Sequence, residues 1–80
     1  MYYTYVLKSS FNNDIYVGST ENTDKRLRLH NLGKVKSTKA CRPWVLMEVI
    51  EFETRSEACK NEMFLKTGQQ KERLRRKYCQ

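Results

Sequence analysis

The chain has 80 residues, of which 39% are hydrophobic and 31% charged, and its formal net charge is +7. A chain of this length suits one small domain and buries only roughly 60–65% of its unfolded surface. The composition is typical of a globular protein and excludes a disordered one. No apolar run approaches the roughly 20 residues that span a bilayer, and the N-terminus lacks the features of a secretory signal. We therefore expect one globular domain over residues 1–80 and no membrane association.

The cysteines indicate the redox compartment. Cys41, Cys59 and Cys79 are odd in number, widely spaced and without a Cys-x-x-Cys pair. The single histidine, His30, cannot complete a zinc site with them. This pattern favours a reduced, cytoplasmic protein.

The positive charge is concentrated in two blocks, residues 25–42 and residues 66–77. The first block contains no acid and the second contains only Glu72. Segregated basic blocks on a small domain favour a polyanionic partner such as nucleic acid. Charge alone leaves a second interpretation open, in which these residues form solvated helix faces and a basic tail.

The first half of the chain predicts a β-hairpin and a helix. Tyr2–Lys8 and Asp14–Ser19 are rich in aromatic and β-branched residues and are separated by a short polar stretch, which is typical of a hairpin. A helix should follow from about Thr23 to Leu32. Asn22 or Thr23 can cap its start, and Gly33 can supply the left-handed residue beyond its end.

The basic stretch Lys34–Arg42 is predicted to be a loop. Pro43 then opens a strand, Trp44–Phe52, because proline cannot donate to a ladder but is tolerated at a strand start. Simple alternation divides this strand into two faces. Val45, Met47 and Val49 would lie on one face, and Trp44, Leu46, Glu48 and Ile50 on the other.

Two more helices are predicted after this strand. The segment from Thr54 to Glu57 has the spacing of a capping box and starts a helix that ends before Gly68. Gln69–Tyr78 is predicted to form a third, short and basic helix. The order β-β-α-β-α-α gives a small antiparallel sheet that needs helices packed on it, which is an α+β domain.

Three groups of polar residues suggest chemistry beyond folding. Tyr3 and Tyr5 share one face of the first strand, and Tyr16 lies on the second strand, although tyrosine is also a good strand former. Arg26 and His30 share one face of the first helix, which an exposed polar face would also explain. Glu62 lies on a helix face with Ala58 and Leu65, where a carboxylate suits metal binding or, alternatively, an exposed pair with Lys66.

Phosphodiester hydrolysis requires this combination of groups. A water must be activated, and charge must be stabilised on the phosphate and on the leaving oxygen. A carboxylate-held Mg²⁺ and an arginine can supply the electrostatic stabilisation. A tyrosine can position the water or relay its proton.

The spacing of these residues resembles a known family. Tyr3-Thr4-Tyr5, ten intervening residues and then Tyr16-Val17-Gly18 resemble the paired signature of the GIY-YIG nucleases. The segment 24–31 resembles that family's first helix, and Ser56-Glu57-Ala58 with residues 62–66 resembles its second. The basic loop and Lys66-Thr67-Gly68 further resemble the small single-domain bacterial members, of the excinuclease-like or UPF0213-like type.

The resemblance implies a three-stranded antiparallel sheet flanked by helices, and it implies a role for each matching residue. Tyr16 would activate or position water, Tyr5 would hydrogen-bond within the site, and Arg26 would stabilise the phosphate. Glu62 would hold a single Mg²⁺ or Mn²⁺. His30 would contact the phosphate or share in proton transfer.

The chain departs from the signature at three positions, where Tyr3, Thr4 and Val17 replace the family's first Gly and its two Ile residues. Gly18 is retained, and glycine in a strand is typical of a close approach by backbone or substrate, or of a bulge.

The first functional hypothesis is therefore a metal-dependent endonuclease, acting on DNA in preference to RNA and with low sequence specificity. Specificity would come from a protein partner, from self-association or from substrate shape, and repair, recombination and mobile-element roles all stay open. The alternatives are a non-catalytic nucleic-acid-binding module with the same fold, and a protein-interaction domain that uses Trp44 or Phe11 as exposed anchors. The expected nucleic-acid contacts are Lys25, Arg28, Lys34, Lys36, Lys39, Arg42, Lys66 and Lys71.

Overall fold

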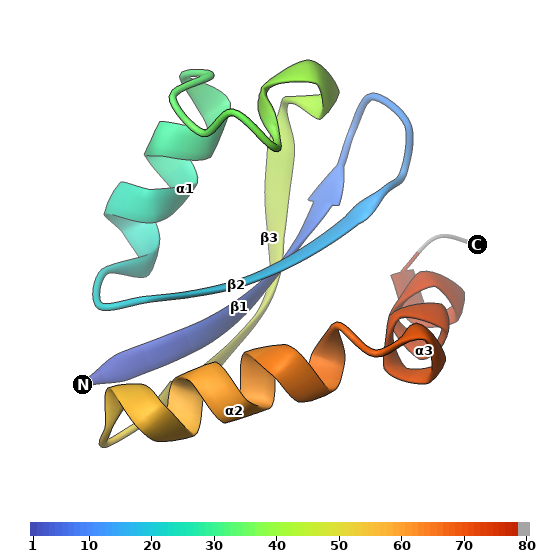
Figure 1. The fold of residues 1–80 in the computed structure, drawn as a ribbon. Coiled ribbons are helices and arrows are strands. Elements are labelled where there is room, and N and C mark those ends of the chain that lie inside the picture. Colours follow the sequence, from blue (N-terminus) through green and yellow to red (C-terminus); the bar gives the residue numbers. More distant parts are fainter. Residues whose placement is uncertain (79–80) are drawn as a thin grey trace.

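A computed structural model describes residues 1–78 and contains a three-stranded antiparallel sheet in the order β2-β1-β3 (Figure 1). The predicted order β-β-α-β-α-α and the α+β class are confirmed. The strands are β1 (Tyr2–Ser9), β2 (Ile15–Thr20) and β3 (Trp44–Phe52), and the α-helices are α1 (Thr23–Asn31), α2 (Arg55–Leu65) and α3 (Gly68–Tyr78). No helix within these residues has the length and apolar character needed to cross a membrane.

The ends of the helices follow the predicted local signals. The Asn22 side chain accepts a hydrogen bond from the Lys25 backbone at the start of α1, and Gly33 has a φ of +76° just beyond its end. Thr54 and Glu57 form the capping box of α2, with the Thr54 side chain accepting from the Glu57 backbone at 3.2 Å. The predicted loop between α1 and β3 contains one short 3-10 turn, Lys39–Cys41.

Alternation along β1 divides the core into two parts, one on each face of the sheet. Tyr5 and Leu7 pack with Trp44 on the face covered by α1. Val6 and Val17 pack with Leu74 on the face covered by α2 and α3. In Figure 1, α1 and the loop that follows it lie on one side of the sheet, and α2 and α3 lie on the other.

The predicted simple alternation along β3 is wrong, because the pairing of β1 with β3 shifts between Val6 and Leu7. Leu7 pairs with Leu46 but Val6 pairs with Glu48, so Met47 is the extra residue of a bulge. A bulge reverses the facing of the residues that follow it. Leu46 accordingly faces α1, whereas Glu48 faces α3 and accepts a hydrogen bond from the Tyr78 hydroxyl at 2.5 Å.

Side-chain hydrogen bonds attach the helices to the sheet. The Thr4 hydroxyl donates to the Ala58 carbonyl at 2.8 Å and fixes α2 against β1. On the other face, the Asn31 side-chain amide pairs with both backbone polar groups of Trp44. Asn31 Oδ1 accepts from the Trp44 N–H at 2.6 Å, and Asn31 Nδ2 donates to the Trp44 carbonyl at 3.0 Å. These bonds fix α1 relative to the start of β3.

Candidate active site

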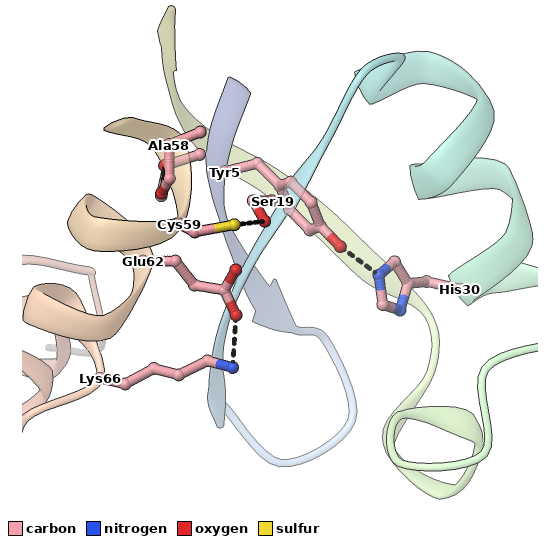
Figure 2. Close-up of polar contacts among 8 residues, drawn as sticks. Tyr5, Ser19, His30, Ala58, Cys59, Glu62 and Lys66 are labelled. Atoms are coloured by element: carbon pink, nitrogen blue, oxygen red, sulfur yellow. Dashed lines mark hydrogen bonds and ion pairs between the residues drawn. The ribbon is translucent and has the colours of Figure 1, made fainter. Parts of the chain in front are cut away.

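The candidate residues gather around β2, which is an edge strand of the sheet. Tyr5 and His30 lie on the α1 side of this strand, and Glu62 and Lys66 reach it from α2 on the other side (Figure 2). Tyr16 is on β2 itself, with its ring on the α1 side. The site is therefore built from two layers of the fold that meet at one edge.

Tyr5 is buried, with 1% of its surface exposed, and its hydroxyl lies 2.9 Å from Nε2 of His30. Its strand partner is Gly18. A Cβ atom at Gly18 would lie 2.5 Å from the Tyr5 hydroxyl oxygen and 2.7 Å from Cζ. Gly18 is therefore required because the Tyr5 ring crosses the space that any side chain would fill. The close approach at this glycine is made by a neighbouring side chain, whereas the sequence pattern predicted an approach by backbone or substrate, or a bulge.

His30 is completely buried and continues the hydrogen-bond chain that begins at Tyr5. Its Nδ1 lies 2.7 Å from the Thr38 hydroxyl, which donates its only proton to the Val35 carbonyl at 3.3 Å. Thr38 must therefore accept from Nδ1–H, and Nε2 of the neutral ring is left to accept from the Tyr5 hydroxyl. The order of donation is Tyr5 to His30 to Thr38 to the backbone.

The ionisation of this pair agrees with that order. Burial raises the pKa of Tyr5 to about 12, although the adjacent Arg26 guanidinium acts in the opposite direction. Burial also lowers the pKa of His30, and Arg26 contributes to this shift. At neutral pH the phenol keeps its proton and the imidazole is uncharged. His30, at 0% exposure, cannot contact a phosphate directly, so only a role through Tyr5 is compatible with its position.

Tyr16 is the more open of the two signature tyrosines. Its ring is half-buried, and its centroid lies 5.0 Å from that of His30 and 6.1 Å from that of Trp44. Lys66 Nζ is 5.9 Å from its ring centroid. Its hydroxyl has no hydrogen-bond partner among residues 1–78, so this hydroxyl, unlike that of Tyr5, is available to a water or a substrate oxygen.

Arg26 brings a permanent positive charge to the same side of β2. Its guanidinium lies close enough to Tyr5 and His30 to favour a lower pKa for both groups. Together with Lys25 and Leu29 it lines an open depression of about 340 Å³. A planar guanidinium at the wall of an open depression is suited to binding a phosphate group.

Glu62 supplies the carboxylate on the α2 side. Its side chain is 20% exposed, and its Oε2 lies 2.6 Å from Lys66 Nζ. Burial alone would raise the pKa of Glu62, but hydrogen bonds from Lys66 and Ser19 outweigh it and hold the pKa below its ordinary value. Glu62 is therefore ionised at neutral pH. The Glu62–Lys66 ion pair, which was the alternative interpretation of Glu62 from the sequence, is present.

The donor set fits a divalent cation with few protein ligands. Within the described part of the chain, no group of three His, Cys, Asp or Glu side chains is placed to hold a metal. Mg²⁺ takes oxygen ligands and is commonly bound by one or two carboxylates together with water and substrate phosphate. A single ionised, partly exposed Glu62 beside a phosphate-binding arginine meets that requirement. Lys66 would have to give up the carboxylate.

The basic residues expected to bind nucleic acid are divided among several places. Lys25 adjoins Arg26, and Lys66 adjoins Glu62. Lys71 lies on α3, whose core contacts are on the opposite face of the sheet from α1. The remaining members lie on α1 or on the loop that follows it, and they are exposed: Arg28, Lys34, Lys36, Lys39 and Arg42.

Several contributors to the site could not be identified from the sequence. Thr38 orients His30, and Ser19 contacts Glu62, yet neither belongs to a motif and each meets its partner only after folding. Trp44 was a candidate exposed anchor, but it is 5% exposed because it packs in the core against Tyr5 and Leu7. That part of the protein-interaction hypothesis is wrong.

Comparison with known proteins identifies the family. The model of the GIY-YIG catalytic domain matches residues 1–78. A UPF0213 protein of Staphylococcus haemolyticus (strain JCSC1435) is 37% identical over 75 residues, which cover 92% of this chain and 90% of that relative. UPF0213 protein YsiG of Lactococcus lactis is 36% identical over 66 residues, covering 81% of this chain and 62% of the relative. No solved structure is a significant match. The chain therefore belongs to the GIY-YIG family, a family of nuclease domains, and resembles the small proteins named UPF0213 within it.

Proposed function

We propose that this protein is a metal-dependent endonuclease that hydrolyses phosphodiester bonds, with DNA as the favoured substrate and with low intrinsic sequence specificity. The observation that carries the proposal is the convergence of Tyr16, Arg26 and Glu62, from three different elements, around strand β2. Tyr16 and Arg26 both adjoin Tyr5, and Lys66, the ion-pair partner of Glu62, lies 5.9 Å from the Tyr16 ring centroid. Tyr16, Arg26 and Glu62 supply a free hydroxyl, a fixed cation and an ionised carboxylate, the groups that phosphodiester hydrolysis needs.

Tyr16 acts on the attacking water, and Arg26 acts on the phosphate that the water attacks. The Tyr16 hydroxyl hydrogen-bonds the attacking water and orients it, or relays its proton, with the oxygen accepting the proton of the water as the phenol's own proton passes to solvent. The Arg26 guanidinium binds the non-bridging oxygens of the scissile phosphate and stabilises the negative charge that grows on them.

Glu62 is the residue that would hold Mg²⁺ or Mn²⁺. When bound, such a cation supplies charge stabilisation to the phosphate and to the leaving oxygen. Glu62 itself stays ionised because Lys66 and Ser19 stabilise the carboxylate. Lys66, displaced from the carboxylate, keeps a positive charge beside the Tyr16 ring and the approaching phosphate.

Tyr5 and His30 act as positioning residues. The Tyr5 phenol is buried and its proton is engaged by His30, so it is not suited to attack or to accept a proton from water. Its part is to pack beside the Tyr16 ring, with 6.3 Å between the two ring centroids, and so to hold that ring in place. The basic residues around the site would contact phosphates without reading bases, so a protein partner or self-association would have to add sequence specificity.

One observation favours a second candidate function, a nucleic-acid-binding module that does not cut. The chain's own Lys66 occupies the Glu62 carboxylate at 2.6 Å, which is the arrangement expected if the carboxylate served only a salt bridge. The exposed basic loop would serve binding equally well.

A cleavage panel separates the two candidates. Labelled duplex, flap, branched and single-stranded DNA, and RNA, are incubated with the protein in Mg²⁺, in Mn²⁺ and in chelator. Glu62→Gln is tested beside the wild type, and Glu53→Gln, an exposed carboxylate outside the site, is the matched control. We expect metal-dependent cutting by the wild type and by Glu53→Gln, and a loss of at least about a hundredfold in Glu62→Gln.

Binding is measured in parallel in chelator, where no cutting occurs. Glu62→Gln should bind nucleic acid as well as the wild type, because the substitution removes a negative charge and no phosphate contact. Full cutting by Glu62→Gln contradicts the assignment of this residue. Binding without cutting across the whole panel favours the non-catalytic module.

A further inference from the structure

Phe11 stands at the tip of the β1–β2 turn and is 72% exposed, the highest exposure of any large hydrophobic residue in the described chain. It borders an open depression of about 520 Å³, whose other walls are Lys36, Lys39, Ala40 and Arg42. The depression thus combines one aromatic ring with three cations and no acid. This site lies outside the group of residues around β2.

The turn that presents Phe11 is held in place by hydrogen bonds. Ser9 Oγ accepts from the backbone N–H of Phe11 at 3.0 Å and from that of Asn12 at 3.2 Å, and donates to the Cys41 carbonyl. The Ser10 N–H donates to the Pro43 carbonyl at 2.9 Å. The aromatic ring is therefore exposed on a preorganised turn, and its exposure does not arise from a loose segment.

The opposite wall is also fixed. Thr38, between Lys36 and Lys39, is buried and bonded to His30, and its carbonyl accepts from the Trp44 indole N–H at 2.9 Å. The Arg42 guanidinium lies against the backbone of Gly33, where an added Cβ would come within 1.7 Å of it. The basic wall is thereby tied through Thr38 to the Tyr5–His30 pair.

We propose that this depression is a binding subsite for an unpaired nucleobase, which stacks on Phe11 while Lys36, Lys39 and Arg42 contact its flanking phosphates. The inference rests on the proposed function and names its substrate class, a nucleic acid with a single-stranded segment. An aromatic ring beside a cationic groove is the usual platform for unpaired bases, because every base has a face that stacks. Paired bases are already stacked within the duplex and cannot cover the ring.

The position of the subsite relates it to the cut. Four residue steps of β1 separate Tyr5 from Ser9, which correspond to about 13 Å at the rise of a β-strand. The turn that carries Phe11 is therefore close enough to the residues around β2 for one nucleic-acid strand to contact both places.

The test compares the affinities of Phe11 variants for single-stranded and fully paired oligonucleotides, measured by fluorescence anisotropy in chelator. Separate DNA and RNA arms identify which strand is bound. Phe11→Ala and Phe11→Leu remove the aromatic face, and Phe11→Trp keeps one. Phe64→Ala is the matched control, because Phe64 is also exposed, at 55%, but does not line the depression. Thermal unfolding of each variant checks that the fold is kept.

We expect Phe11→Ala and Phe11→Leu to lose about five- to a hundredfold in affinity for single strands, with duplex affinity unchanged. Phe11→Trp should bind single strands as the wild type does, and so should Phe64→Ala. Wild-type affinity in Phe11→Leu, or an equal loss for duplex, overturns the stacking subsite and leaves the endonuclease proposal standing. If the wild type binds no nucleic acid of any form, the proposed function fails as well, so the two failures are distinguishable.

Discussion

The two sides of strand β2 differ in how they hold their polar residues. On the α1 side, Tyr5 and His30 are at 1% and 0% exposure and are joined in one directed hydrogen-bond chain. On the α2 side, Glu62 and Lys66 form a partly exposed ion pair, with side-chain exposures of 20% and 47%. A buried chain with every group satisfied fixes geometry, whereas a partly exposed pair can exchange partners at small cost. The difference teaches that the buried pair, Tyr5 and His30, positions the site, whereas the partly exposed pair, Glu62 and Lys66, is able to exchange its partner for a ligand.

The largest expected effect comes from the two tyrosines, which should respond in opposite ways. Tyr16→Phe removes a hydroxyl that has no partner among residues 1–78, so we expect cleavage to fall about a hundredfold or more with stability unchanged. Tyr5→Phe leaves Nε2 of buried His30 unsatisfied, so we expect a loss of about 1–3 kcal/mol in the free energy of unfolding. Cleavage rates and urea unfolding curves measure the two effects. A large stability loss in Tyr16→Phe with none in Tyr5→Phe would reverse the roles assigned to the two tyrosines.

Gly18→Ala tests how tightly the α1 side is packed. The new methyl group would lie 2.5 Å from the Tyr5 hydroxyl oxygen, so the ring must move or the strand must bend. We expect a loss of about 1–3 kcal/mol in the free energy of unfolding, typical of overpacking. Gly68→Ala is the control, since its methyl group would have no neighbour within 4 Å. Equal unfolding midpoints for the two variants would mean that Tyr5 does not need the space above Gly18.

The pH dependence of stability should also come from the α1 side. The folded-state pKa of His30 is below its unfolded value, so the unfolded chain takes up the proton first and stability falls as pH drops below about 6.5. The folded-state pKa of Tyr5, about 12, is above its unfolded value of 10.0, so stability falls as pH rises above about 10. Between these limits neither group contributes a slope.

Unfolding curves at pH 5 to 7 check the acidic limb. His30→Gln should flatten the slope between about pH 6.5 and pH 5, whatever its effect on stability at pH 7. The lowered pKa of Glu62 adds a separate loss only below about pH 4.5, outside this window. An unchanged slope in His30→Gln would show that His30 is not the group that titrates.

The smallest effect is expected on the α2 side. Lys66→Met removes the cation that competes for the Glu62 carboxylate, so we expect affinity for Mn²⁺ to rise up to about fivefold, the worth of a partly exposed ion pair. Calorimetric titration in the absence of nucleic acid measures this directly. Lys60→Met, an exposed lysine of the same helix with no partner at Glu62, is the control. Weaker Mn²⁺ binding in Lys66→Met would mean that Lys66 does not compete for the carboxylate.

The sequence predicted the elements well because their signals are local. Asn22, Gly33 and the Thr54 capping box fix helix ends through neighbours in the chain, and all three act as predicted. The two strands that carry Tyr5 and Tyr16 likewise pair as the predicted hairpin.

Features that depend on tertiary contact could not be predicted. The bulge at Met47 is set by how β1 and β3 fit together, so alternation within β3 alone gave the wrong faces. The partner of His30 is Thr38, brought from the following loop, and an isolated histidine on a polar helix gives no sign of complete burial. The ring of Phe11 borders a basic depression only because folding brings Lys36, Lys39 and Arg42 beside the β1–β2 turn, and the sequence does not show this contact.

Asn31 also affects the outer edge of strand β3. Its side-chain amide meets the N–H and carbonyl of Trp44 as a peptide group of an added strand would. β3 is an outer strand of the sheet, and an outer strand with free backbone groups is a template for pairing with another chain. Asn31 occupies the N–H and carbonyl of Trp44, so these two backbone groups at the start of β3 cannot pair with an incoming strand.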